Sequence, residues 1–169
     1  IVHSIAFANR EDLGGDFSDL SKDGFTLALE TSSYSLVTIA REASKYFSKD
    51  GASVISMTFD ASTKVYPGYN VMGTAKAALE NINRQLSAQF GPNKTRFNSI
   101  SAGPLPSLSA RSIPGFTEMR KAHEERSPIK RPITHEEVAN TALFLISDMS
   151  SGITGSIIPV DGGYGIIAL

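Results

Sequence analysis

The chain has 169 residues, of which 41% are hydrophobic and 20% are charged, as in a single globular domain of ordinary size. Its formal net charge of −1 argues against binding to nucleic acid or to an anionic membrane surface, because both require a positive excess. The absence of cysteine excludes disulfides and thiolate metal sites and fits a reducing cytoplasm. No apolar run approaches the ~20 residues of a membrane span. We therefore expect one cytoplasmic domain over residues 1–169, without membrane insertion.

Strands and helices are predicted to alternate along the chain. Short apolar and β-branched runs indicate strands, and apolar residues at every third or fourth position indicate helices. Two helix starts are marked, by Ser21 as an N-cap and by Thr134, which can form a capping box with Glu137. This alternation implies an α/β protein with a parallel sheet. The strands are predicted at 1–4, 52–59, 95–103 and 155–163, and the helices at 21–47, 69–90, 115–125 and 134–149.

The predicted helix over 69–90 carries polar groups on one side, away from its apolar stripe. Tyr69 and Lys76 are seven residues apart, which places them two turns apart and within about 20° around the axis. Gly73 between them costs up to ~1 kcal/mol of helix stability, so we expect a flat molecule to approach there. A neutral phenol can donate to an oxygen that becomes anionic, and an ammonium can bind a sugar hydroxyl. Alternatively, Tyr69 is a helix-start aromatic, Lys76 a solvated charge and Gly73 merely tolerated.

Four stretches together resemble the enoyl-acyl-carrier-protein reductases, a divergent branch of the short-chain dehydrogenase/reductase superfamily. They are VHSIAFA from residue 2, YNVMGTAKAALE from residue 69, NSISAGPL from residue 98 and GITGSIIPVDGG from residue 152. The resemblance implies a Rossmann-like, doubly wound parallel sheet. The family's glycine-rich dinucleotide loop and its acidic ribose partner are absent from these residues. We therefore expect that the N-terminal part of the fold is missing from this chain.

The resemblance also implies an activity and roles for residues. Such an enzyme reduces the trans-2 double bond of an enoyl thioester on acyl carrier protein, with NADH or alternatively NADPH, and is a homotetramer. Hydride passes to the β-carbon while Tyr69 stabilises the enolate by hydrogen bonding, and Lys76 holds the nicotinamide ribose. The wider superfamily has its tyrosine four residues before the lysine, where Met72 stands here. Met72 thus disfavours one alternative, a carbonyl-reducing short-chain dehydrogenase; the other alternative is an inactive fragment.

The family's ligand positions map onto loops at the carboxyl ends of strands, where ligands bind in open α/β sheets. The predicted catalytic pair is Tyr69 and Lys76, and no metal site is expected because the three histidines lack ligand spacing. The predicted cofactor contacts are Ser4, Ile5, Ala6, Thr58, Lys76, Ala102, Gly103, Pro104, Leu105 and Ser107. The predicted substrate contacts are Ala8, Phe59, Tyr69, Met72, Leu108, Ile113 and Phe116.

Two positions depart from the family's pattern. Phe59 stands where many members have a second active-site tyrosine, so it can pack against a ligand but cannot hydrogen-bond to it. Pro106–Ser107 replaces the usual Arg-Thr, and Ser107 can still donate to a phosphate from a stiffer backbone. Because Phe59 has no hydroxyl, Tyr69 would act without a second phenol.

Residues 104–126 are predicted to form a substrate-binding lid within the domain. The segment is rich in proline and serine, leaves a strand beside the cofactor positions and holds one short predicted helix. Its sparse apolar side chains suit an acyl chain. The overlapping basic stretch 119–131 has six basic residues if His123 is protonated. It is either a solvated loop and helix or a docking rim for an acidic carrier protein.

Overall fold

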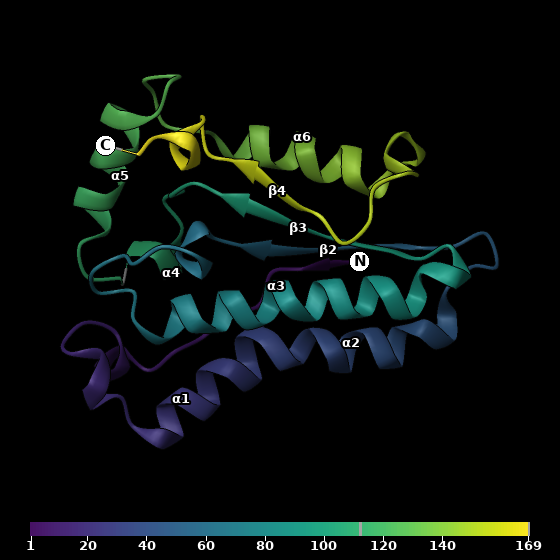
Figure 1. The fold of residues 1–169 in the computed structure, drawn as a ribbon, viewed down its shortest axis with the longest axis horizontal. Coiled ribbons are helices and arrows are strands. Elements are labelled where there is room, and N and C mark those ends of the chain that lie inside the picture. Colours follow the sequence, from purple (N-terminus) through teal and green to yellow (C-terminus); the bar gives the residue numbers. More distant parts are fainter. Residues whose placement is uncertain (112, 169) are drawn as a thin grey trace.

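The strands form one parallel four-stranded sheet in the order β1-β2-β3-β4, as Figure 1 shows. The predicted parallel α/β class is therefore confirmed. The computed structural model describes residues 1–111 and 113–168; Ser112, inside the predicted lid, and Leu169, at the end of the predicted domain, lie outside the described residues. The strands are β1 (Val2–His3), β2 (Ser53–Thr58), β3 (Arg96–Ala102) and β4 (Ile157–Val160).

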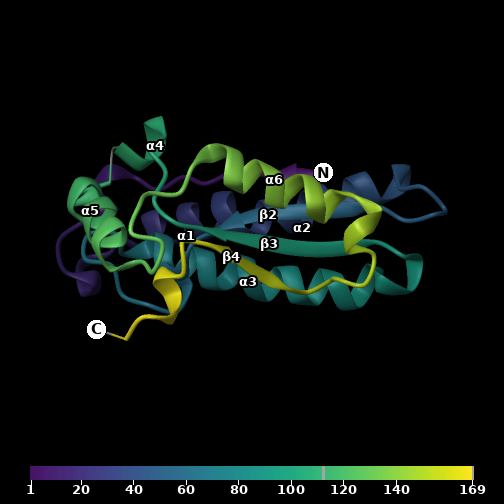
Figure 2. The ribbon, with the colours of Figure 1, turned by 90° about the horizontal axis from the view of Figure 1, so that it is seen from above.

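Helices cover both faces of the sheet, which is the predicted doubly wound, Rossmann-like arrangement (Figure 1 and Figure 2). The helices α1 (Lys22–Leu29), α2 (Ser35–Ala43) and α3 (Val71–Phe90) lie on one face. The other face is covered by α6 (His135–Ile146), and α4 (Leu108–Arg111) and α5 (Phe116–Arg126) stand at the carboxyl ends of the strands.

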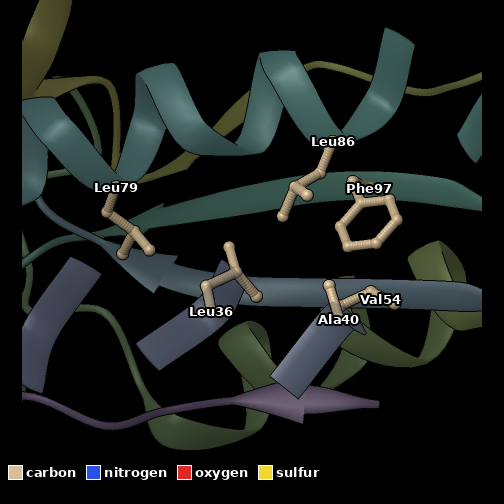
Figure 3. Packing of buried hydrophobic residues seen from close by; sticks show 6 residues of the cluster. All are labelled: Leu36, Ala40, Val54, Leu79, Leu86 and Phe97. Atoms are coloured by element: carbon tan, nitrogen blue, oxygen red, sulfur yellow. The ribbon is translucent and has the colours of Figure 1, made fainter. Parts of the chain in front are cut away.

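The apolar core is divided between the two faces of the sheet. Side chains of successive strand residues point to opposite faces, so Val54 and Phe97 face α3, whereas Ile55 and Ile100 face α6. Figure 3 shows the cluster on the α3 side, which comprises Leu36, Ala40, Val54, Leu79, Leu86 and Phe97. Burying one such Leu or Phe side chain contributes about 1.5–3 kcal/mol. These two clusters hold the sheet that carries the polar residues described below.

The helix predicted over 21–47 is helical from Lys22 to Tyr46, but it is not one regular α-helix, because Glu30–Tyr34 form a π-helical turn between α1 and α2. Two serines of this turn, Ser32 and Ser33, are buried against the loop after β1 and against α3. Ser33 Oγ donates to the Ala75 carbonyl oxygen of α3 at 2.7 Å, and Ser32 Oγ donates to the Phe7 carbonyl oxygen at 3.1 Å. Tertiary hydrogen bonds thus accompany the widened turn, which helical periodicity alone does not reveal.

The remaining helices match their predictions more closely. The capping box of Thr134 and Glu137 is present at the start of α6. The segment after β3 holds two helices, α4 and α5, where one was predicted. In the described part of the chain, no helix is long and apolar enough to cross a bilayer.

Candidate active site

A cavity of about 460 Å³ opens at the carboxyl ends of β2 and β3, where ligands bind in open α/β sheets. It is enclosed by the loop after β1, the start of α3, the segment after β3 and the first turns of α6. Stretches that are distant in the sequence therefore meet around one space. The predicted site residues that line it are Ser4, Thr58, Phe59, Tyr69, Lys76, Ala102, Gly103, Pro104, Leu105, Ser107, Ile113 and Phe116.

Tyr69 reaches the cavity from a turn and not from a helix. The prediction that Tyr69 lies on the helix is wrong, because α3 begins at Val71 after a residue with positive φ, Asn70 (φ 36°). The Asn70 side-chain amide donates to the Gly14 carbonyl oxygen and holds this unusual backbone. The Tyr69 ring packs edge-on against Phe59, with ring centroids 5.4 Å apart. Burial, and secondarily the charge of Asp60, raise the pKa of Tyr69 to about 12.

Lys76 is buried beside the cavity, with 6% of its surface exposed. This excludes the alternative that it is a solvated surface charge. Its ammonium donates to the Met57 carbonyl oxygen of β2 at 2.9 Å. Burial lowers the pKa of Lys76 to about 8, and the charge of Glu80, one turn further along α3, opposes that shift. The ammonium is therefore mostly charged at neutral pH.

Gly73 is approached by the protein's own backbone. A Cβ at Gly73 would lie 2.8 Å from the Ala61 carbonyl oxygen, so the turn Asp60–Ser62 packs directly on the helix there. The expectation that a flat ligand approaches Gly73 is thus wrong. The missing side chain instead allows this turn to bring Asp60 close to Tyr69.

Five predicted site residues are not among those that line the cavity. Ile5 and Ala6 are exposed on the loop after β1, and Leu108 on α4 is 89% exposed. Met72 is buried with Phe59 and Tyr69, and Ala8 packs against the same cluster. These positions remain predictions for ligand contacts.

The sequence did not predict that α6 lines the cavity, and it assigned no role to Met57 on β2 or to Glu80 on α3. Residues His135, Val138, Ala139 and Ala142 of α6 line the cavity, as do Val2, Met57, Ala110 and Met119. The capping box located the start of α6 but did not tell which strand end it faces. The spacing of Lys76 and Glu80, four residues apart, was a signal that these side chains are neighbours on one helix.

His123 does not contribute charge to the basic stretch over 119–131. It is buried and stacks on the Tyr164 ring, with centroids 3.6 Å apart, while its Nε2 hydrogen-bonds with the Tyr66 hydroxyl at 3.2 Å. Burial lowers the pKa of His123 to about 4, although Asp60 and Asp161 act in the opposite direction. His123 therefore adds no charge to this stretch at neutral pH, and the docking rim for an acidic carrier protein stays a prediction that rests on the other basic residues.

The residues around the cavity fit the nicotinamide half of a dinucleotide. Within the described residues the Lys76 ammonium makes one hydrogen bond, so two of its donors remain for ribose hydroxyls. The Ser107 hydroxyl accepts from the Ala110 amide, which leaves its own proton for a phosphate oxygen. Apolar side chains from β2, α5 and α6 form the walls, as a planar ring requires.

The family model described as Enoyl-(Acyl carrier protein) reductase matches residues 1–165. The chain belongs to this family. It is 46% identical over 169 residues to the NADH-type enoyl-[acyl-carrier-protein] reductase of Synechocystis sp., covering 100% of this chain and 65% of that protein. It is 48% identical over 164 residues to the NADPH-type enzyme of Staphylococcus aureus, covering 97% of this chain and 64% of that protein. The resemblance seen in the four sequence stretches is thereby confirmed.

Solved structures of the family have the same fold. The Bacillus cereus reductase, solved with NADP+ and indole naphthyridinone, is 46% identical and has a TM-score of 0.96, covering 99% of this chain and 65% of that chain. The Aquifex aeolicus reductase is 40% identical with a TM-score of 0.95, covering 100% of this chain and 66% of that chain. The chain spans about 65% of the length of the relatives it matches.

Proposed function

We propose that the protein carrying this chain reduces the trans-2 double bond of an enoyl thioester on acyl carrier protein, as a step of fatty-acid synthesis. The observation that carries the proposal is that Tyr69 and Lys76 line one cavity. Met72, which occupies the position of the superfamily tyrosine, is packed beside Tyr69 and has no proton to donate. Relatives 46% and 48% identical are named enoyl-[acyl-carrier-protein] reductases, with NADH and NADPH respectively, so NADH with NADPH as the alternative is proposed here.

In this proposal, Tyr69 donates a hydrogen bond to the thioester carbonyl oxygen, where negative charge develops. A pKa of about 12, raised by burial and by Asp60, means that the phenol keeps its proton at neutral pH. Within the described residues no hydrogen bond engages this hydroxyl, so its donor is available to a ligand. One such donor supplies about 2.7–4 kcal/mol of transition-state stabilisation.

Lys76 positions the cofactor in this proposal. A bound reduced nicotinamide supplies the hydride, and the protein supplies geometry and charge around it. The Met57 carbonyl oxygen fixes the Lys76 ammonium, whose remaining donors bind the ribose hydroxyls. The proposed cofactor contacts are Ser4, Ile5, Ala6, Thr58, Ala102, Gly103, Pro104, Leu105 and Ser107, and the proposed acyl contacts are Ala8, Phe59, Met72, Leu108, Ile113 and Phe116.

Residues 104–126 are proposed as a lid over the acyl chain. The exposure of Leu108 on α4 supports this, because a large apolar side chain in solvent gains stability when a ligand covers it. In contrast, α5 is anchored by the stacking of His123 on Tyr164. We expect hydrogen exchange of the α4 amides to slow markedly when cofactor and an acyl ligand bind, with a smaller change in α5. Equal exchange of the α4 amides in both states contradicts a lid.

A cytoplasmic homotetramer is proposed on the basis of family resemblance alone. Light scattering coupled to gel filtration measures the assembly, and a monomeric mass contradicts it.

The decisive experiment for the reaction compares two substrates. The protein carrying this chain is assayed with a crotonyl thioester and with a ketoacyl thioester, each with NADH and with NADPH. Oxidation of the cofactor with the crotonyl thioester alone is the expected result. Turnover of the ketoacyl thioester alone would favour a carbonyl-reducing dehydrogenase, and no turnover of either would favour an inactive protein.

A further inference from the structure

Two buried charges lie one turn apart on α3, at the level where β2 ends. Lys76 and Glu80 are each only 6% exposed, although a buried charge is costly unless other groups satisfy it. Each is satisfied by β2: the Thr58 hydroxyl donates to Glu80 Oε1 at 2.8 Å, and the Lys76 ammonium donates to the Met57 carbonyl oxygen at 2.9 Å. Two consecutive residues of one strand thus hold the two charges in fixed places.

The two side chains differ in their access to the cavity. Lys76 and Thr58 line it, whereas Glu80 is not among its lining residues. An effect of Glu80 on a bound ligand therefore acts through Lys76 or through Thr58, and the charge of Glu80 acts on Lys76. The hydrogen bond from the Thr58 hydroxyl fixes the position of the Glu80 carboxylate.

Two other titratable groups near Lys76, His3 and Tyr69, do not supply a negative charge at neutral pH. Burial followed by the charge of Lys76 lowers the pKa of His3 on β1, so His3 adds no negative charge there. Tyr69, in the turn before α3, stays protonated because burial raises its pKa to about 12. Within the described residues, Glu80 is the negative charge that acts on Lys76, and it opposes the effect of burial on the lysine pKa.

We propose that Glu80, held by Thr58, is a positioning residue that keeps the Lys76 ammonium charged at the wall of the cavity. Without this carboxylate, burial acts on Lys76 unopposed and the neutral amine becomes more populated near pH 7. The consequence for cofactor binding rests on the role proposed above for Lys76. The charge itself can be measured without any turnover.

The test is a titration of Lys76 by carbon-13 NMR of labelled lysine, in the protein carrying this chain, with the signal assigned by Lys76→Arg. Glu80→Gln removes the charge and keeps both the size and an acceptor for Thr58. Its Lys76 midpoint should move to lower pH by about one pH unit. Glu42→Gln is the matched control, because Glu42 is exposed on α2 and pairs with Lys45, so its midpoint should stay unchanged. An unchanged midpoint in Glu80→Gln overturns the proposal.

A second pair of variants tests the part assigned to Thr58 and serves if Glu80→Gln does not fold. Thr58→Val removes the donor with little change of shape and should lower the Lys76 midpoint, whereas Thr58→Ser keeps the donor and should restore it. Equal midpoints in these two variants overturn the role of Thr58.

Calorimetry separates this proposal from the proposed function. As pH rises from 7 to 9, cofactor affinity should begin to fall at a lower pH in Glu80→Gln than in the unaltered protein. This result supports both the charge proposal and the cofactor role of Lys76. If the NMR midpoint moves while affinity does not change with pH, the charge proposal holds and the cofactor role of Lys76 fails.

Discussion

The two ends of α3 are built from different chemistry. The first half begins after a residue with positive φ, packs against a backbone turn at Gly73 and buries Lys76 and Glu80. The second half packs Leu86 and its neighbours against an apolar cluster that includes Phe97. Buried charges and a constrained backbone cost stability, whereas apolar burial supplies it. One helix thus anchors the fold at one end and holds two buried charges at the other.

The largest expected effect is on stability, at the apolar end. Leu86→Ala removes most of a buried side chain and leaves a cavity between α3 and the sheet, so the free energy of unfolding should fall by about 3 to 4 kcal/mol. Denaturant unfolding measures this loss. The turnover number, measured well below the unfolding temperature, should stay unchanged. A large loss of turnover in the folded variant would show that the two ends are not separable.

The next largest effect is on the reaction, at the polar end. Tyr69→Phe removes the proposed donor and should lower kcat by about 10²-fold, equivalent to about 2.7 kcal/mol, with little change in cofactor affinity. Its unfolding free energy should change far less than that of Leu86→Ala, because the ring and its contact with Phe59 are kept. Steady-state assays with an enoyl thioester provide the measurement. Wild-type turnover would remove Tyr69 from the proposed mechanism.

The same glycine-to-alanine substitution at each end of α3 sharpens the comparison. Gly73→Ala puts a Cβ 2.8 Å from the Ala61 carbonyl oxygen, and the cost of about 2 kcal/mol exceeds the gain in helix propensity of up to ~1 kcal/mol. Gly91→Ala at the far end meets no atom within 4 Å and has a helical backbone, so it should be neutral or slightly stabilising. Thermal unfolding of both variants is the measurement. Equal melting temperatures would contradict the close contact at Gly73.

The smallest effect is a pH dependence that arises from Lys76. Burial lowers its pKa from an ordinary value of 10.5 to about 8, so between these values the unfolded chain binds the proton and the folded protein does not. Stability from this group therefore rises as pH increases from 8 towards 10.5, and the cost of the buried charge is fully present below pH 8. Relative to Lys76→Met, the unaltered protein should gain about 1 kcal/mol between pH 8 and 9 in denaturant unfolding. A pH-independent difference would mean that Lys76 is not buried as described.

Much of the fold followed from local patterns in the sequence. Alternating strand and helix signals predicted the parallel sheet, because each signal depends on residues within a few positions of one another. The capping box at Thr134 placed the start of α6 for the same reason. The helix boundary near Tyr69 was wrong because the backbone at Asn70 is held by Gly14, a residue 56 positions away.

The sequence by itself determined the α/β class and the family, and it predicted that Tyr69 and Lys76 share one site, because motifs, their spacing and periodicity are local properties. Only the tertiary structure decided that the buried Lys76 donates to a carbonyl oxygen of β2, that Gly73 packs against the Ala61 carbonyl oxygen and that Thr58 donates to Glu80. These contacts join segments that are separate along the chain, and the pKa of a buried group depends on every segment that removes water from it. Periodicity shows which side of a helix is buried, but the partner on that side is known only once the sheet has formed.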